Sequence, residues 1–67
     1  MIQYYKIEFS YLLCDGKRTT EKDEFSAFDL KDVMCTAEEE YGDLPGYRLE
    51  HIWREGATTW DDVTPED

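Results

Sequence analysis

The N-terminal segment constrains the fold most strongly, because its apolar side chains recur at every second position. A period of two residues is typical of a β-strand with one apolar face. The dipeptide Asp15-Gly16 follows directly, and it is a common hairpin turn. We therefore expect a long first strand that turns back on itself. Its apolar face would carry Tyr5, Ile7, Phe9, Tyr11 and Leu13.

The position of Phe25 decides between two registers of this hairpin. A two-residue loop would place Phe25 opposite Lys6, on the polar face of the first strand. A three-residue loop over residues 15–17 would place it opposite Ile7, on the apolar face. We therefore predict the longer loop. The second strand, over residues 18–26, is rich in charged side chains, which suits an exposed sheet edge.

A helix is predicted between Asp29 and Gly42. Asp29 is a suitable N-cap, Asp32 follows three residues later as an imperfect capping box, and Gly42 is a common helix terminator. Apolar side chains recur between them at helical spacing, which predicts one buried face. That face would carry Leu30, Val33, Met34, Ala37 and Tyr41.

The C-terminal third has the pattern of a second hairpin. Residues 47–54 alternate, Glu55-Gly56 is a turn signal, and residues 57–63 form a short last strand. A two-residue loop would pair Trp53 with Thr58 and His51 with Trp60, and residues 64–67 would fray. One face would then carry Leu49, His51, Trp53, Thr58 and Trp60.

Together these elements predict a single α+β domain over residues 1–67. Its order is β-β-α-β-β, an antiparallel sheet of three to four strands with one helix packed on one face.

Charge restricts the classes of partner. The chain has 67 residues and a net charge of −10. Direct binding to nucleic acid or to an anionic membrane needs clustered Lys and Arg, so both are disfavoured. A basic protein surface is the natural partner, and the alternative is that the charge only keeps the protein soluble. No apolar run has the length of a membrane span and no leader pattern is present, so we expect a cytoplasmic protein.

The residue types that carry chemistry are sparse. His51 is the single histidine, and a lone histidine beside a tryptophan in a strand is more often a packing residue than a base. Cys14 and Cys35 lack the spacing of a zinc site, and neither has a neighbouring cation that would activate a thiolate. We expect both to be reduced, part-buried thiols, with a Cys14–Cys35 disulfide as the alternative. The sequence therefore predicts no catalysis, no metal and no cofactor.

The negative charge is unevenly distributed. Residues 1–25 carry five acids and four bases, residues 26–46 six acids and one base, and residues 47–67 six acids and two bases. Acids in the last helical turn face the negative end of the helix dipole, where they are locally unfavourable. Such a cluster suggests a role outside the fold, and the alternative is a solvated helix end. The predicted partner-binding residues are two acidic patches with two aromatic residues that would supply central contacts: Glu38, Glu39, Glu40 and Asp43; Asp61, Asp62, Glu66 and Asp67; and Tyr4 and Tyr47.

The layout resembles that of small bacteriophage-encoded inhibitor proteins. Residues 25–42, FSAFDLKDVMCTAEEEYG, are similar to the single helix after a hairpin in such proteins, and residues 46–53, GYRLEHIW, to the strand that follows. The resemblance is to anti-CRISPR proteins and to inhibitors of host RNA polymerase. It implies a protein that binds a large host assembly through a short charged surface, and it assigns no residue a role.

Two functions are consistent with these features. The first is an acidic, DNA-mimic-like inhibitor that blocks the nucleic-acid surface of a host or defence protein. The second is a non-catalytic interaction or regulatory module, either a monomer or a homodimer, that uses apolar and strand-edge contacts.

Overall fold

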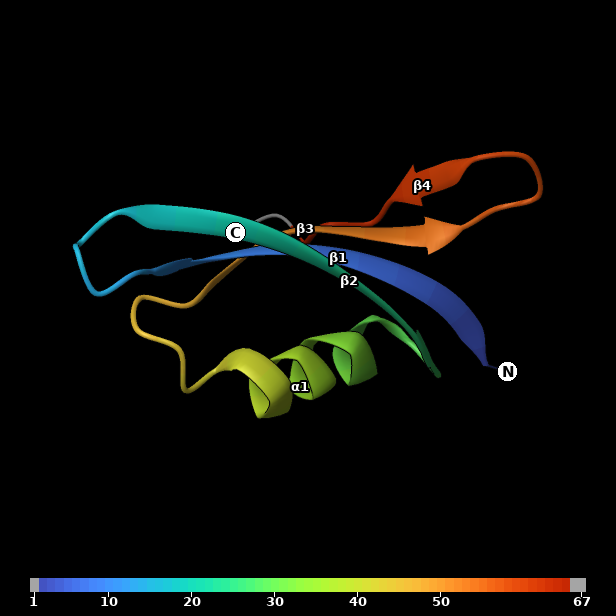
Figure 1. The fold of residues 1–67 in the computed structure, drawn as a ribbon. Coiled ribbons are helices and arrows are strands. Elements are labelled where there is room, and N and C mark those ends of the chain that lie inside the picture. The colour runs from blue at the N-terminus through green and yellow to red at the C-terminus, as the bar shows by residue number, and fades with distance from the viewer. Residues whose placement is uncertain (1, 66–67) are drawn as a thin grey trace.

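A computed structural model describes residues 2–65 as one antiparallel sheet and one helix (Figure 1). The strands lie in the order β2-β1-β3-β4, and α1 runs along one face of the sheet. The predicted α+β class and element order are therefore confirmed. The elements are β1 (Gln3–Leu12), β2 (Arg18–Ala27), α1 (Leu30–Tyr41), β3 (Arg48–Glu55) and β4 (Trp60–Asp62).

The core lies between α1 and the two central strands. The alternation in β1 buries every second side chain, as predicted, and β3 adds Ile52, which is fully buried. From the helix, Val33 and Ala37 close the core. Leu13 and Met34, both predicted on buried faces, are instead 45% and 42% exposed. Leu13 lies beyond the end of β1, and Met34 lies at the rim of the helix face.

The first hairpin has the predicted loop length in a different place. The loop consists of residues 14–16, closed by the Leu13 N–H donating to the Lys17 carbonyl oxygen at 2.7 Å. Gly16 takes φ of +85° at the last loop position, where a three-residue loop requires a left-handed residue. Sequence reasoning had put this glycine in the middle of the loop. Phe25 therefore lies opposite Tyr5 rather than Ile7, a shift of two residues that leaves it on the predicted face.

The helix begins as its sequence predicts. The Asp29 side chain accepts from the Asp32 N–H at 2.8 Å, and the Asp32 side chain accepts from the Phe28 N–H at 3.0 Å. This reciprocal arrangement satisfies two backbone donors at the helix start. Gly42 is the C-cap, and its N–H donates to the Glu38 carbonyl oxygen at 2.7 Å.

The second hairpin differs from its prediction in both register and length. Its turn spans residues 56–59, so Trp53 pairs with Asp62 and Trp60 pairs with Glu55. The last strand is shorter than the expected residues 57–63. A bulge in β3 at Glu50 changes the alternation, so Leu49 lies on the core face and His51 does not.

The chain after β4 is anchored where fraying had been predicted. The Ile52 N–H donates to the Thr64 hydroxyl and the Val63 N–H donates to the Ile52 carbonyl oxygen, each at 2.9 Å. These bonds hold the segment against β3 as far as Thr64. The rest of the predicted frayed segment, residues 66–67, lies outside the described residues.

Candidate functional site

The helix exit carries the first group of predicted partner-binding residues. Glu38, Glu39, Glu40 and Asp43 are all exposed, and no basic residue lies in the last turn of α1. The helix dipole makes this the unfavourable end for acids. Among residues 2–65 only two ion pairs form, Lys22–Glu8 and Arg48–Glu50, and neither involves the helix. We call Glu38, Glu39, Glu40 and Asp43 the helix-exit acids.

Tyr47 lies beside this group but belongs to the edge of the core. Its ring packs against Phe9 with the ring centroids 6.1 Å apart, and it is only partly exposed. Burial raises the pKa of the Tyr47 hydroxyl, and the nearby Glu38 carboxylate raises it further. The hydroxyl oxygen is buried without a hydrogen-bond partner in the described structure. Tyr47 is therefore placed to support the helix exit from the core, rather than to lie at the centre of a contact surface.

The second predicted acidic group lies on β4. Asp61 and Asp62 are both exposed, and as neighbours in a strand they point to opposite sides of the sheet. The Thr64 hydroxyl and N–H lower the pKa of the Asp62 carboxyl, the N–H donating to its Oδ1 at 2.9 Å. Asp62 is therefore firmly anionic at neutral pH. Glu66 and Asp67, predicted to extend this group, lie outside the described residues.

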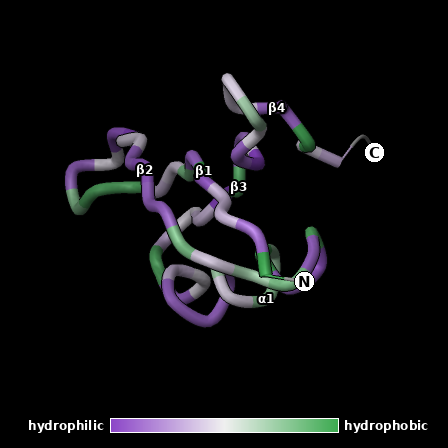
Figure 2. Tube along the Cα trace, turned by 90° about the vertical axis from the view of Figure 1, so that its right-hand side faces the viewer, coloured by the Kyte–Doolittle hydropathy of each residue, from purple (hydrophilic) through white to green (hydrophobic). Residues whose placement is uncertain are grey.

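The structure does not bring the two acidic groups together. The helix exit lies below one end of the sheet, whereas β4 is an edge strand near the other end (Figure 1). Figure 2 shows the same separation from the side, with α1 below the sheet and β4 at its upper edge. A single short row of carboxylates therefore cannot include both groups, and the helix-exit acids form the more compact one.

Sequence reasoning placed His51, Trp53 and Trp60 on one sheet face, and the structure confirms it, but it missed that Tyr4 and Lys6 of β1 join them on the face opposite the helix. The Lys6 ammonium lies over the rings of Trp53 and Trp60, 5.4 Å and 4.7 Å from their centroids. Tyr4 lies 6.2 Å from Trp60 and His51 stacks on Trp53 at 5.4 Å, centroid to centroid. We call these five residues the aromatic face. The alternation along β1 places Tyr4 and Lys6 on one side of that strand, and the alternation along β3 does the same for His51 and Trp53. The two pairs come together only because β1 and β3 are neighbours in the sheet.

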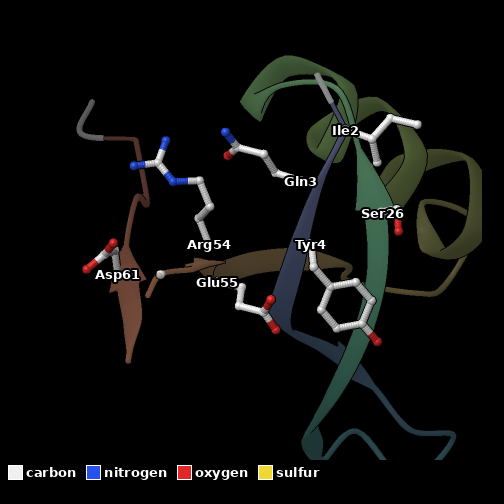
Figure 3. Close-up of a pocket in the computed structure, with 8 residues that line it drawn as sticks. Ile2, Gln3, Tyr4, Ser26, Arg54, Glu55 and Asp61 are labelled. Carbon is white, nitrogen blue, oxygen red and sulfur yellow. The ribbon is translucent and has the colours of Figure 1, made fainter. Parts of the chain in front are cut away.

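A cleft borders the aromatic face where β1 and β3 separate. The last pair between these strands is Tyr5–Arg54, and beyond it the β3–β4 turn diverges from the N-terminal end of β1. The cleft has a volume of about 630 Å³. Figure 3 shows that Tyr4 and Glu55 project to one side of it, whereas Gln3 and Arg54 project to the other. Glu55 thus adds a carboxylate next to the aromatic face.

The structure also places the two cysteines and the potential metal ligands of the described residues. No group of three or more His, Cys, Asp or Glu side chains in residues 2–65 could hold a metal ion. Cys14 and Cys35 are free thiols on the hairpin turn and on the helix, and both are exposed, not part-buried as predicted. The predicted burial fails because the turn lies outside the core and Cys35 lies on the outer side of α1. Among the residues described, no helix has the length and apolar character needed to cross a membrane.

Comparison with known proteins gives no relative: no family model, curated protein or solved structure matches this chain.

Proposed function

We propose that this chain is an acidic inhibitor that binds the basic, nucleic-acid-binding surface of a host or defence protein. The observation that carries the proposal is the set of helix-exit acids, exposed at the unfavourable end of α1 and without an ion pair among residues 2–65. Carboxylates placed against the helix dipole give up some stability. A basic groove on a partner would supply the missing counter-charges and would lose access to nucleic acid.

The distribution of the basic residues supports this proposal. Several of the seven Lys and Arg side chains are engaged within the fold. Lys22 and Arg48 form ion pairs, Lys6 lies over two indoles, and Arg18 donates to Ser10 and to the Gly46 carbonyl oxygen at 2.9 Å. Apart from the bond to Gly46, which lies in the loop between α1 and β3, these contacts are on the sheet. The helix exit therefore presents negative charge that the rest of the chain does not offset.

The proposal is tested by comparing two sets of charge variants. The triple substitution Glu38→Lys, Glu39→Lys and Glu40→Lys should abolish binding to a basic partner while leaving thermal stability equal or higher, because cations suit the helix C-terminus. The control set is the single reversal Asp15→Lys, compared with Glu39→Lys alone, because Asp15 is exposed on the β1–β2 turn and belongs neither to the helix exit nor to the aromatic face. If the two single reversals weaken binding equally, net charge alone accounts for it, and the helix exit has no special role.

A second candidate function is an interaction module that uses apolar contacts. An open hollow of about 560 Å³ lies at the β1–β2 turn, and its lining is mostly apolar. Leu13 is 45% exposed there, beside Leu44 and Pro45. Sedimentation of the wild type and of Leu13→Glu tests this candidate. A dimer that Leu13→Glu dissociates would favour this second function in its homodimeric form, and a monomer at all concentrations would exclude that form.

A further inference from the structure

The aromatic face has a composition that neither acidic group shares. Two indoles, a phenol and an imidazole lie side by side on an otherwise polar sheet surface, and Tyr4 is 40% exposed. The face of an aromatic ring attracts cations through its quadrupole, and tryptophan does so most strongly. In this chain that attraction is already in use, because the Lys6 ammonium lies over both indole rings.

The charges around the aromatic face are mainly negative. Glu24 lies opposite Lys6 across the β1–β2 ladder, and Asp62 lies opposite Trp53 across the β3–β4 ladder. Glu55 is paired with Trp60 and projects to the same side as Tyr4 (Figure 3). The Lys22–Glu8 ion pair on the same face adds no net charge, so Lys6 is left among three carboxylates that form no ion pair among the described residues. The surface retains an excess of negative charge after its own lysine is counted.

A guanidinium group fits this combination better than an ammonium group does. It is planar, so it stacks on an indole or phenol ring. It is also more weakly hydrated, so its transfer out of water costs less hydration free energy. Its donors also match a carboxylate with two parallel hydrogen bonds. The cleft beside Tyr4 and Glu55 leaves room for a long side chain to enter from the end of the sheet.

We propose that the aromatic face binds an arginine side chain of a basic protein segment, and that Lys6 competes with it for the indole rings. This inference rests on the proposed function, the binding of a basic protein, and it adds a contact site distinct from the helix-exit acids. Arginine stacks on Trp60 and Tyr4 and pairs with Glu55. Lys6 lowers the affinity because it holds part of the same aromatic surface and repels a second cation.

Trp53 and Trp60 are the chain's two tryptophans, so tryptophan fluorescence, excited at a wavelength that tyrosine does not absorb, reports on this face alone. The probes are a short arginine-rich peptide, the same peptide with lysine at each arginine, and the same peptide with neutral citrulline. We expect a saturable change with the arginine peptide, weaker binding with lysine, and no change with citrulline. Trp60→Ala should weaken arginine binding about fivefold, the order expected of one partly exposed cation–π contact. Tyr4→Ala, at a more exposed position, gives the same test should Trp60→Ala fail to fold.

The direction in which a substitution of Lys6 changes the affinity for the arginine peptide discriminates best between the outcomes. Lys6→Met should raise the affinity for the arginine peptide about threefold or more, since it frees the rings and removes a like charge. A loss of affinity in Lys6→Met would overturn the inference, as would equal binding of the arginine and lysine peptides. A fluorescence change on adding single-stranded oligonucleotide but not arginine peptide would assign the face to base stacking instead.

Nuclear magnetic resonance separates failure of this inference from failure of the proposed function. If the arginine peptide shifts the amide signals of the helix-exit acids but not the two indole N–H signals, the inference fails and the proposed function stands. If the peptide shifts neither set, both fail. A shift of the indole signals that persists in the variant with Glu39→Gln and Glu40→Gln supports a separate arginine site.

Discussion

The hydrogen bond between Tyr41 and Asp23 joins the end of α1 to the edge strand β2, and Tyr41→Phe isolates its contribution. The Tyr41 hydroxyl donates to Asp23 Oδ2, while the ring stacks on Phe9 with centroids 4.1 Å apart. Phenylalanine keeps the stacking and removes only the hydroxyl. Hydrogen bonds to charged groups contribute about 1.5–3 kcal/mol when buried. This one is partly exposed, so we expect a loss of about 1 kcal/mol.

In a domain of this size a loss of about 1 kcal/mol lowers Tm by roughly 4–8 °C, which thermal denaturation followed by circular dichroism measures readily. The matched control is Tyr11→Phe, which removes a similar bond to Glu21, 2.6 Å long but exposed to solvent. Its Tm should fall by less. Equal shifts in the two variants, or no shift in Tyr41→Phe, would refute the reasoning that burial sets the value of these bonds.

The pH dependence gives an independent check of the same bond. The hydrogen bond to Asp23, with burial and nearby carboxylates, raises the pKa of Tyr41 from 10.0 to about 12. A group whose pKa is raised on folding contributes its full stability below its unfolded pKa and loses it as pH rises through the folded value. The difference in stability between wild type and Tyr41→Phe should therefore be constant up to about pH 10 and should vanish towards pH 12. A difference that persists unchanged at high pH would contradict this assignment.

Four further substitutions test the fold by thermal denaturation. Gly46→Ala should lower the free energy of unfolding by about 2–3 kcal/mol, because φ is +65° and the new Cβ would lie 2.7 Å from Leu12 Cγ. Gly16→Ala, at φ of +85° but with open space around the Cβ, should lower it by about 1 kcal/mol. Equal losses in the two variants would argue against the contact with Leu12. Asp29→Ala should cost about 1 kcal/mol through loss of the N-cap, and no change would deny it that role. Ile52→Ala, in the fully buried centre of β3, should cost about 2–5 kcal/mol and unfold much of the population of so small a domain; a mild loss would place the core elsewhere.

The sequence predicts those parts of the fold that depend on local pattern. The alternation in β1 and the apolar spacing of α1 place Ile7 and Val33 in the core without any knowledge of the neighbouring elements. The N-cap at Asp29 is likewise local, because it depends on a side chain and a backbone group three residues apart. Each of these features is determined within one helix turn or one strand.

The registers of the hairpins depend on contacts that the local pattern does not contain. The bulge at Glu50 accompanies a hydrogen bond from the buried Ser10 hydroxyl to the Glu50 carboxylate at 2.9 Å, a contact across two strands. Arg18 donates to the same hydroxyl from a third strand. A single sequence does not reveal which strands are neighbours, so it could not predict this network, nor that β1 adds Tyr4 and Lys6 to the aromatic face.

The candidate site was predictable in composition but not in arrangement. The helix-exit acids follow from the helix boundary, and the structure places them together as expected. Asp61 and Asp62 were predicted from charge alone as a second acidic patch, and the sequence did not show how far the sheet separates it from the first. Tyr47 was proposed as a contact because it is aromatic; its ring packs on Phe9, and its role as a contact stays a prediction.

The central claim, that this chain blocks the nucleic-acid surface of a basic protein, is tested most directly by competition. The chain is immobilised, exposed to bacterial lysate at low salt, and the retained protein is challenged with duplex DNA, with RNA and with high salt. We expect the chain to retain a basic nucleic-acid-binding protein, and we expect nucleic acid and high salt each to release it. The variant with lysine at positions 38, 39 and 40 should not retain it. Retention of no such protein, or equal retention by the variant, would contradict the central claim.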